Sequence, residues 1–238
     1  MHTLLAISLV LASLSLMLTL LTHVCVRRIL RSRAGSGSVR PISVLKPLKG
    51  LDDELYANLR SLVSQDYPAF ELVLGCEDWS DPALPMARQL QRDFPQVSIV
   101  VVAGTAAAGL NPKVKTLRLL SQHAQHDWVL VSDSNVRAAP GYLAAMAAEL
   151  DDPRVGLVTS LLVGAGEQSL GARLDNLHMN SFIVRAVCGA SAIADYPCVI
   201  GKSMLFSSST FAKLGGFALV DDVLAEDYVI GRCFAEAG

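Results

Sequence analysis

Asp133 is the residue whose setting most favours chemistry, because it closely follows a short apolar run at residues 128–131. The run, W-V-L-V, lies between polar segments, which is typical of a strand buried on both faces of a sheet. Open parallel sheets bind ligands where their strands end, at the carboxyl edge. A carboxylate there, beside the oxygens of Ser134 and Asn135, suits a Mg²⁺ or Mn²⁺ ion that carries a diphosphate. The alternative is a capping role, since Asp-Ser-Asn also favours a turn.

Two further acidic positions join Asp133. Asp78 stands two residues past an apolar run at residues 70–76, so a parallel arrangement places it at the same edge. Glu226 and Asp227 follow a Gly-Gly turn and open the last helical stretch. Each position has a plain alternative, Asp78 as a loop acid and the Glu-Asp pair as first-turn acids that the helix dipole favours. Their joint occurrence favours one shared site.

Strand and helix signals alternate through the body of the chain. Apolar runs that predict strands stand at residues 42–45, 70–76, 97–102, 128–131 and 155–162. Helical patterns lie at residues 55–63 after an acidic opening, at 81–93 after Asp-Pro, beyond Asn-Pro-Lys at 111–113, and at 140–150. This alternation predicts the α/β class, with a mostly parallel sheet and helices on both of its faces.

Helical spacing also relates Leu170, Leu174, Leu177 and Phe182. Packing against the core is the default interpretation of such an apolar stripe. In an enzyme that acts on a lipid, the same stripe would instead face the membrane or the entrance for the lipid.

The N-terminal segment is a candidate membrane anchor. Residues 3–26 carry no charge and residues 4–21 are almost wholly apolar, which is long enough to cross a bilayer as a helix. A cleaved signal peptide fits poorly, because the segment has neither a basic start nor a small-residue cleavage site. Five arginines and no acid follow, so the positive-inside rule keeps that flank cytoplasmic. We expect a transmembrane helix at residues 1–26, a basic juxtamembrane linker at 27–40 and a cytoplasmic domain at 41–238.

Charge and cysteine content exclude other classes. Beyond residue 40 the chain has 15 Lys and Arg against 22 Asp and Glu, a net charge of −7. A body this acidic is not expected to bind nucleic acid. The five cysteines show no C-x-x-C pair and no metal-ligand spacing, so we expect reduced packing residues.

Short motifs are distributed through residues 41–238, and two of them are narrow signals: L-K-P-L-K-G at residues 45–50 and N-P-K at 111–113. The others are Q-D-Y-P at 65–68, Asp78 with D-P at 81–82, D-S at 133–134, V-G-L-V at 155–158, C-V at 198–199 with Gly201 and Ser203, G-G at 215–216 and E-D-Y at 226–228. Together they resemble the GT-A glycosyltransferases and, more closely, the ceramide glucosyltransferase family. Bacterial hopanoid glycosyltransferases are similar too, less closely at Lys49 and Glu226.

The resemblance implies roles for individual residues. Asp78 would accept hydrogen bonds from the uracil or ribose of a UDP-sugar, and Lys46 would also bind the donor. Asp133 would hold a Mg²⁺ or Mn²⁺ ion on the diphosphate. Lys113 would offset phosphate charge as a point cation, with an ordinary solvated lysine as the alternative. Asp227 would be the general base on the acceptor hydroxyl, with inversion at the anomeric carbon.

The resemblance thus implies a membrane-anchored inverting enzyme that moves a hexose, with UDP-glucose as expected donor, to a ceramide-like lipid. The alternatives are a hopanoid or other lipid acceptor with UDP-GlcNAc as donor, and an inactive membrane-tethered binding module. Asn135 replaces the second acid of the family's D-x-D motif, so metal coordination would depend on Asp133, waters and phosphate oxygens. The family's (Q/R)-x-x-R-W motif is absent from these 238 residues, and we expect that C-terminal part beyond Gly238.

A reporter fused after Arg40 tests the predicted topology. We expect cytoplasmic reporter activity, because the arginines that follow the apolar segment are retained on the cytoplasmic side. A matched fusion with Arg27, Arg28 and Arg31 changed to Ala should lose part of this bias. Periplasmic or lumenal activity of the unmodified fusion would contradict the topology.

Overall fold

The computed structural model describes residues 2–31, 38–104, 109–194 and 196–238. The chain forms two compact units, which we name by their content. The sheet unit consists of Arg33–Ser160 and Val199–Gly238, and the helical unit consists of Met1–Ser32 and Leu161–Cys198. Part of the predicted linker, residues 32–37, lies outside the described residues.

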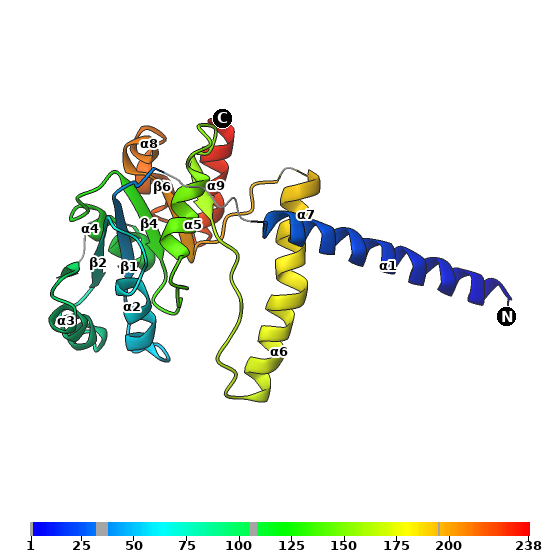
Figure 1. Ribbon diagram of the computed structural model, residues 1–238, viewed down its shortest axis with the longest axis horizontal. Coiled ribbons are helices and arrows are strands. Elements are labelled where there is room, and N and C mark those ends of the chain that lie inside the picture. The colour runs from blue at the N-terminus through cyan, green and yellow to red at the C-terminus, as the bar shows by residue number, and fades with distance from the viewer. Residues whose placement is uncertain (1, 32–37, 105–108, 195) are drawn as a thin grey trace. The chain divides into compact units, whose positions relative to one another are not determined.

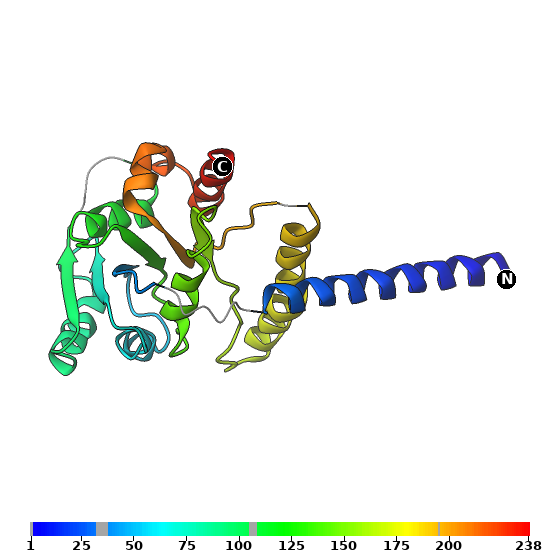
Figure 2. The ribbon, with the colours of Figure 1, turned by 45° about the horizontal axis from the view of Figure 1, so that its top comes forward.

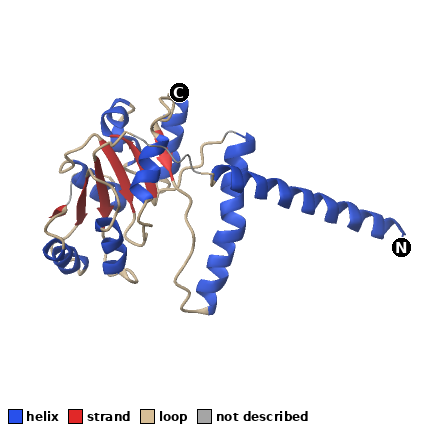
Figure 3. Ribbon diagram, viewed as in Figure 1, coloured by secondary structure: helices blue, strands red, loops and turns tan. Residues whose placement is uncertain are grey.

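A six-stranded sheet is the centre of the sheet unit (Figures 1 and 3). Its strands are β1 (Ile42–Pro47), β2 (Phe70–Cys76), β3 (Ser98–Ala103), β4 (Trp128–Ser132), β5 (Leu157–Thr159) and β6 (Ser203–Ser207). They lie in the order β3-β2-β1-β4-β6-β5, and β1 to β4 are parallel. The predicted mostly parallel α/β sheet is therefore confirmed.

The end of the sheet that contains β5 and β6 differs from the prediction. β6 runs antiparallel to both β4 and β5. The sequence did not predict this strand, because the S-M-L-F-S run has only three apolar residues. β5 is Leu157–Thr159 rather than the predicted 155–162, because at the edge it pairs only with β6, at three positions.

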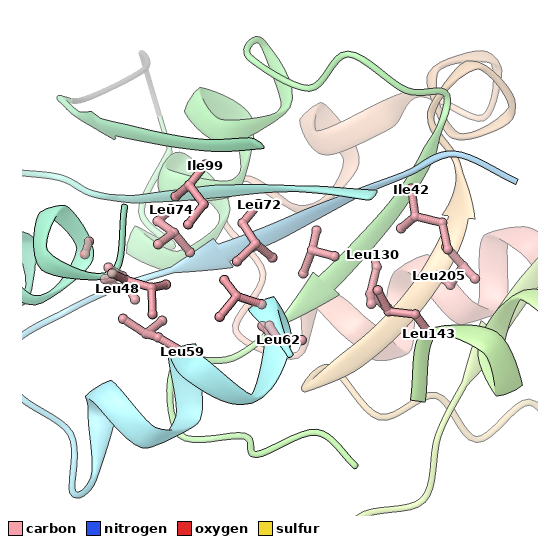
Figure 4. Packing of buried hydrophobic residues seen from close by; sticks show 14 of the residues in the cluster. Ile42, Leu48, Leu59, Leu62, Leu72, Leu74, Ile99, Leu130, Leu143 and Leu205 are labelled. Carbon is pink, nitrogen blue, oxygen red and sulfur yellow. The ribbon is translucent and has the colours of Figure 1, made fainter. Parts of the chain in front are cut away.

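Helices cover both faces of the sheet. They are α2 (Leu55–Val63), α3 (Ala83–Asp93), α4 (Pro112–Ser121), α5 (Tyr142–Glu149), α8 (Ser208–Lys213) and α9 (Glu226–Glu236), with a 3-10 turn η2 (Gly216–Val220). Successive strand residues enter opposite cores: Val44 packs with residues of α2, α3 and α5, and Leu45 with residues of α4, α8 and α9. Figure 4 shows the first core, with Leu59 and Leu62 of α2. Burying each such apolar side chain fully stabilises the folded state by about 1.5–3 kcal/mol.

The helical unit contains α1 (His2–Ile29) and a continuous helix made of α6 (Leu170–His178), the π-helical segment η1 (Met179–Ile183) and α7 (Val184–Ala194). α1 has the length and composition predicted for a helix that crosses a membrane. The helix Leu170–Ala194 meets the same criteria of length and composition, which the sequence prediction of a single anchor did not include. The stripe that contains Leu174 and Leu177 is exposed, so packing in the core is not its role.

Candidate active site at the carboxyl edge of the sheet

A cavity of ≈ 440 Å³ opens where β1, β2 and β4 end. Its lining comes from the segments that follow these strands and from the start of α4: Pro47, Leu48, Lys49, Asp52, Glu77, Asp78, Asp81, Pro112, Lys113, Thr116, Asp133, Ser134 and Asn135. Parallel strands bring these segments together because their carboxyl ends share one edge. Of the predicted site residues, the cavity collects Asp78, Lys113 and Asp133.

Lys113 is the hub of the polar contacts around this cavity. Its Nζ lies 2.9 Å from Oδ1 of Asp133 and 2.9 Å from Oε1 of Glu226, and it donates a hydrogen bond of 3.1 Å to the carbonyl oxygen of Gly201. Burial lowers the pKa of Lys113, but the two carboxylates outweigh this effect and the pKa is raised. Lys113 is thus a cation held between two acids and not an ordinary solvated lysine.

The N-P-K motif explains how Lys113 reaches this position. Asn111 is the N-cap of α4, and its Oδ1 accepts hydrogen bonds from the N–H groups of Lys113 (3.0 Å) and Val114 (3.3 Å). Pro112 is the first residue of the helix, where a missing N–H costs nothing. The Nδ2 of Asn111 donates to Val223 O (2.7 Å) and Glu226 Oε2 (3.3 Å), which joins the start of α4 to the start of α9.

Asp133 directs its carboxylate to the cavity and does not cap its own turn. The turn after β4 is closed by the main chain, since the N–H of Val136 donates to Asp133 O over 3.1 Å. Asn135, at the second acidic position of a D-x-D motif, accepts a hydrogen bond of 2.8 Å from Lys202 Nζ through its Oδ1. Only Asp133 therefore offers a carboxylate within this segment.

Lys46, for which the resemblance implies a donor-binding role, lies outside the cavity lining. It is fully buried, and its Nζ donates to Asp133 O (2.5 Å), Val136 O (3.2 Å) and Ser132 Oγ (3.3 Å). Burial lowers the pKa of Lys46 to about 7 against the opposing charge of Asp133. The side chain thus holds the turn that carries Asp133, and it does not line the cavity that was expected to take the donor.

Asp78 lines the cavity at its exposed side, next to Asp81. The Oδ1 of Asp78 accepts from the N–H of Ser80 over 2.8 Å, and this bond lowers the pKa of Asp78. Asp81 joins two segments: both its carboxylate oxygens accept from Gly50 N–H over 3.1 Å, and Oδ1 also accepts from Ala83 N–H at the start of α3. Gly50 has φ 66°, a conformation that favours glycine, which explains the last residue of L-K-P-L-K-G.

Asp227 stands beside the cavity without contributing to its lining. Its Oδ2 accepts from Gly201 N–H and its Oδ1 from Tyr228 N–H, each over 2.8 Å. A Cβ on Gly201 would lie 2.7 Å from this Oδ2, so the contact requires glycine. The peptide groups of Gly201 connect Asp227 to Lys113, since one donates to the acid and the other accepts from the lysine.

Glu226 and Asn111 have contacts in the site that sequence reasoning did not predict. The alternative for Glu226 was a first-turn acid that the helix dipole favours, yet its side chain is only 8% exposed and forms an ion pair with Lys113. The signal in the sequence was the presence of both the N-P-K and the E-D-Y motifs. Asn111 of the first motif and Glu226 of the second are 115 residues apart and form a hydrogen bond in the structure.

Metal binding would depend on few protein ligands. No group of three or more His, Cys, Asp or Glu among the described residues could hold an ion. Asp133 is nevertheless a hard oxygen ligand on the cavity lining, and Lys113 contacts its Oδ1. Since Mg²⁺ retains several waters and binds through one or two carboxylates plus substrate phosphates, this donor set fits a metal that arrives with a diphosphate.

Comparison with known proteins identifies the family. The model of Glycosyl transferase family 21 matches residues 7–238. The chain belongs to this family. Ceramide glucosyltransferase 3 of Caenorhabditis elegans is 26% identical over 84% of the chain and 44% of its own length. Ceramide glucosyltransferase of Komagataella phaffii is 30% identical over 72% of the chain and 38% of its own length. The chain thus spans less than half the length of these curated relatives of the family 21 protein.

Solved structures place the family 21 chain among GT-A glycosyltransferases by fold. The mannosyltransferase PcManGT from Pyrobaculum calidifontis, in complex with GDP-Man and Mn²⁺, covers 98% of the chain and 64% of its own length with a TM-score of 0.67 and 22% identity. S. aureus TarS 1-349 in complex with UDP-GlcNAc covers 81% of the chain and 52% of its own, with a TM-score of 0.51 and 16% identity. The expected GT-A fold is confirmed.

Changing Lys113 to Met tests the polar hub. The variant leaves Glu226 buried and Asp133 partly buried without their shared cation, so we expect the free energy of unfolding to fall by about 1–3 kcal/mol. Lys115→Met, on the same helix, is the control and should change it by less than about 0.5 kcal/mol. Chemical unfolding in detergent, followed by near-ultraviolet circular dichroism, gives both values. Equal values for the two variants would contradict the hub.

Proposed function

We propose that the chain carries the donor site of a membrane-anchored inverting hexosyltransferase that moves glucose from UDP-glucose to the primary hydroxyl of a ceramide-like lipid. The observation that carries this proposal is the cavity in which Asp78 and Asp133 face one space beside the cation of Lys113. The choice of glucose and of a ceramide-like acceptor is supported by the similarity to ceramide glucosyltransferases. The uncharged residues 3–26 of α1 and the arginines at its end support an anchor with the sheet unit on the cytoplasmic side, where nucleotide sugars are present.

The residues of the cavity suit a nucleoside diphosphate. Asp78 is ionised at neutral pH, since its pKa is lowered by the Ser80 N–H, and it accepts from uracil N–H or a ribose hydroxyl. Lys113 offsets phosphate charge while Glu226 keeps its side chain in place. Asp133 and phosphate oxygens would hold the Mg²⁺ or Mn²⁺ ion, which stabilises the charge of the departing diphosphate when it is bound.

In the transfer step, the bond between the anomeric carbon and the diphosphate oxygen breaks and its electron pair leaves with UDP. The acceptor oxygen forms the new bond to the same carbon from the opposite side, which inverts its configuration. Asp227 takes the hydroxyl proton. The backbone N–H groups of Gly201 and Tyr228 donate to its carboxylate and hold this base in one orientation. Neither N–H group titrates.

Replacing each donor-site acid separates their roles. Asp133→Ala should abolish the part of UDP binding that depends on metal, because it removes the proposed metal ligand. Asp78→Ala should weaken UDP binding with or without metal, because it removes an acceptor for the nucleoside. Asp53→Ala, an exposed acid outside the cavity lining, is the control. Isothermal calorimetry measures the affinities, and circular dichroism verifies folding. Unchanged UDP affinity in both folded variants would contradict the assignment of this donor site. Tighter binding of UDP-GlcNAc than of UDP-glucose would instead identify GlcNAc as the transferred sugar.

Asp227→Asn tests the proposed base, since it keeps the size of the side chain and removes the basic oxygen. Donor binding should persist while sugar transfer falls on the order of 10²–10⁴-fold, the usual contribution of a general base. The rival is Asp222, whose Oδ1 accepts from Leu110 N–H over 2.9 Å and thereby holds a neighbouring loop. Transfer assays with labelled UDP-glucose and ceramide compare the two variants. Loss of transfer in Asp222→Asn, with activity retained in Asp227→Asn, would move the base to Asp222.

A further inference from the structure

The helix Leu170–Ala194 exposes large apolar side chains along its length. The exposed fractions are 72% for Leu170, 59% for Leu174, 63% for Leu177, 62% for Phe182 and 58% for Ile193. By length and composition this helix qualifies as a membrane span. We propose that this helix does not cross the membrane but lies in its interface, on the same side of the membrane as the sheet unit, with its exposed apolar side chains in contact with lipid. This inference depends on the membrane anchor of the proposed function.

Chain connectivity excludes a crossing. β5 precedes the helix and β6 follows it, and these two strands are hydrogen-bonded neighbours in one sheet. The Oγ1 of Thr159 donates to Ser203 O over 2.8 Å, so the chain leaves the sheet and returns to it at nearly the same point. Both ends of the intervening segment are therefore on the same side of any membrane, whereas a helix that crosses once has its ends on opposite sides.

A second crossing by the connecting segments is not possible either. Residues 161–169 and 196–202 contain neither helix nor strand. Irregular backbone does not traverse hydrocarbon exposed to lipid, because each unsatisfied group costs several kcal/mol, and isolated bonds such as those between Gly164 and the Asn180 side chain do not form a continuous ladder. One helix with two irregular connections must stay on the side from which it started.

Contact with α1 places the helix at the depth of the interface. Within the helical unit α7 packs against α1, and Cys25 and Cys188 are both buried there. A Cβ added to Gly189 would lie 3.7 Å from Thr22 Cγ2, which identifies the contact as the last turns of α1. Arg27 and Arg28 follow at once, so this is where α1 would leave the bilayer. In Figures 1 and 2 the helix crosses that end of α1 and does not run alongside it.

The charges of the helix agree with this depth. Arg173, Asp175 and Arg185 occur between the exposed apolar residues. A charge near the centre of a spanning helix costs roughly 2.5–3.5 kcal/mol, whereas an interfacial helix keeps its charged side chains among the headgroups. An apolar face buried about 5–10 Å into the boundary between headgroups and acyl chains satisfies both kinds of side chain.

Depth-dependent fluorescence quenching tests the inference on the full chain in nanodiscs. A fluorescent amino acid is incorporated singly at Leu170, Leu177, Phe182 or Ile193, and lipids carry a nitroxide either near the headgroup or near the chain end. We expect the shallow nitroxide to quench all four sites at least twofold more than the deep one. A label at Asp175, an exposed acid of the same helix, is the matched control and should be quenched less by both.

Leu11, in the middle of α1, provides the reference for the anchor. Deep quenching there, combined with deep quenching at Phe182 and shallow quenching at both helix ends, would show a spanning helix and overturn the inference alone. Deep quenching at Leu11 with none at the four helix sites would overturn it as well, as when a second copy covers the face. No quenching at Leu11 would overturn the anchor of the proposed function, and the interfacial helix with it.

Discussion

The ion pairs of Lys113 are the interaction on which the arrangement of the site depends. One ammonium group contacts Asp133 from the segment after β4 and Glu226 from the start of α9, and it donates to Gly201 before β6. These three segments are distant in sequence and would repel or stay unsatisfied without a shared cation. A partly buried charge requires such compensation, because desolvation is costly unless partners replace the water. Lys113 therefore joins these three segments into one site.

A second lysine, Lys46, holds the same turn that Lys113 contacts. Lys46 is entirely buried and donates to main-chain oxygens of the turn that carries Asp133. The lowered pKa of Lys46 reflects the cost of burying its charge, which its hydrogen bonds to the carbonyl oxygens of Asp133 and Val136 partly offset. One lysine thus fixes the position of the Asp133 main chain, and the other contacts its carboxylate.

The same connectivity that builds the site also constrains the helical unit. β5 and β6 are neighbours, so everything between them begins and ends at one point of the sheet. In the proposed arrangement, that closure places the apolar helix Leu170–Ala194 at the boundary between water and lipid. In the proposed enzyme, the chain would thereby meet the membrane through two elements of different orientation, α1 and the helix Leu170–Ala194.

The sequence by itself determined the parallel core of the sheet, the segments that follow its strands, and the apolar α1. Those features follow from local periodicity, since buried strands and apolar spans are continuous runs. It could not determine β6, because its S-M-L-F-S run has only three apolar residues and the strand is held by antiparallel pairing with β4 and β5. Nor could it show that Lys46 points beneath the turn while Lys113 faces the cavity, or that Glu226 pairs with Lys113. Two lysines look alike in a sequence. Only the tertiary structure decides which oxygens surround each of them, and therefore which one lines the cavity.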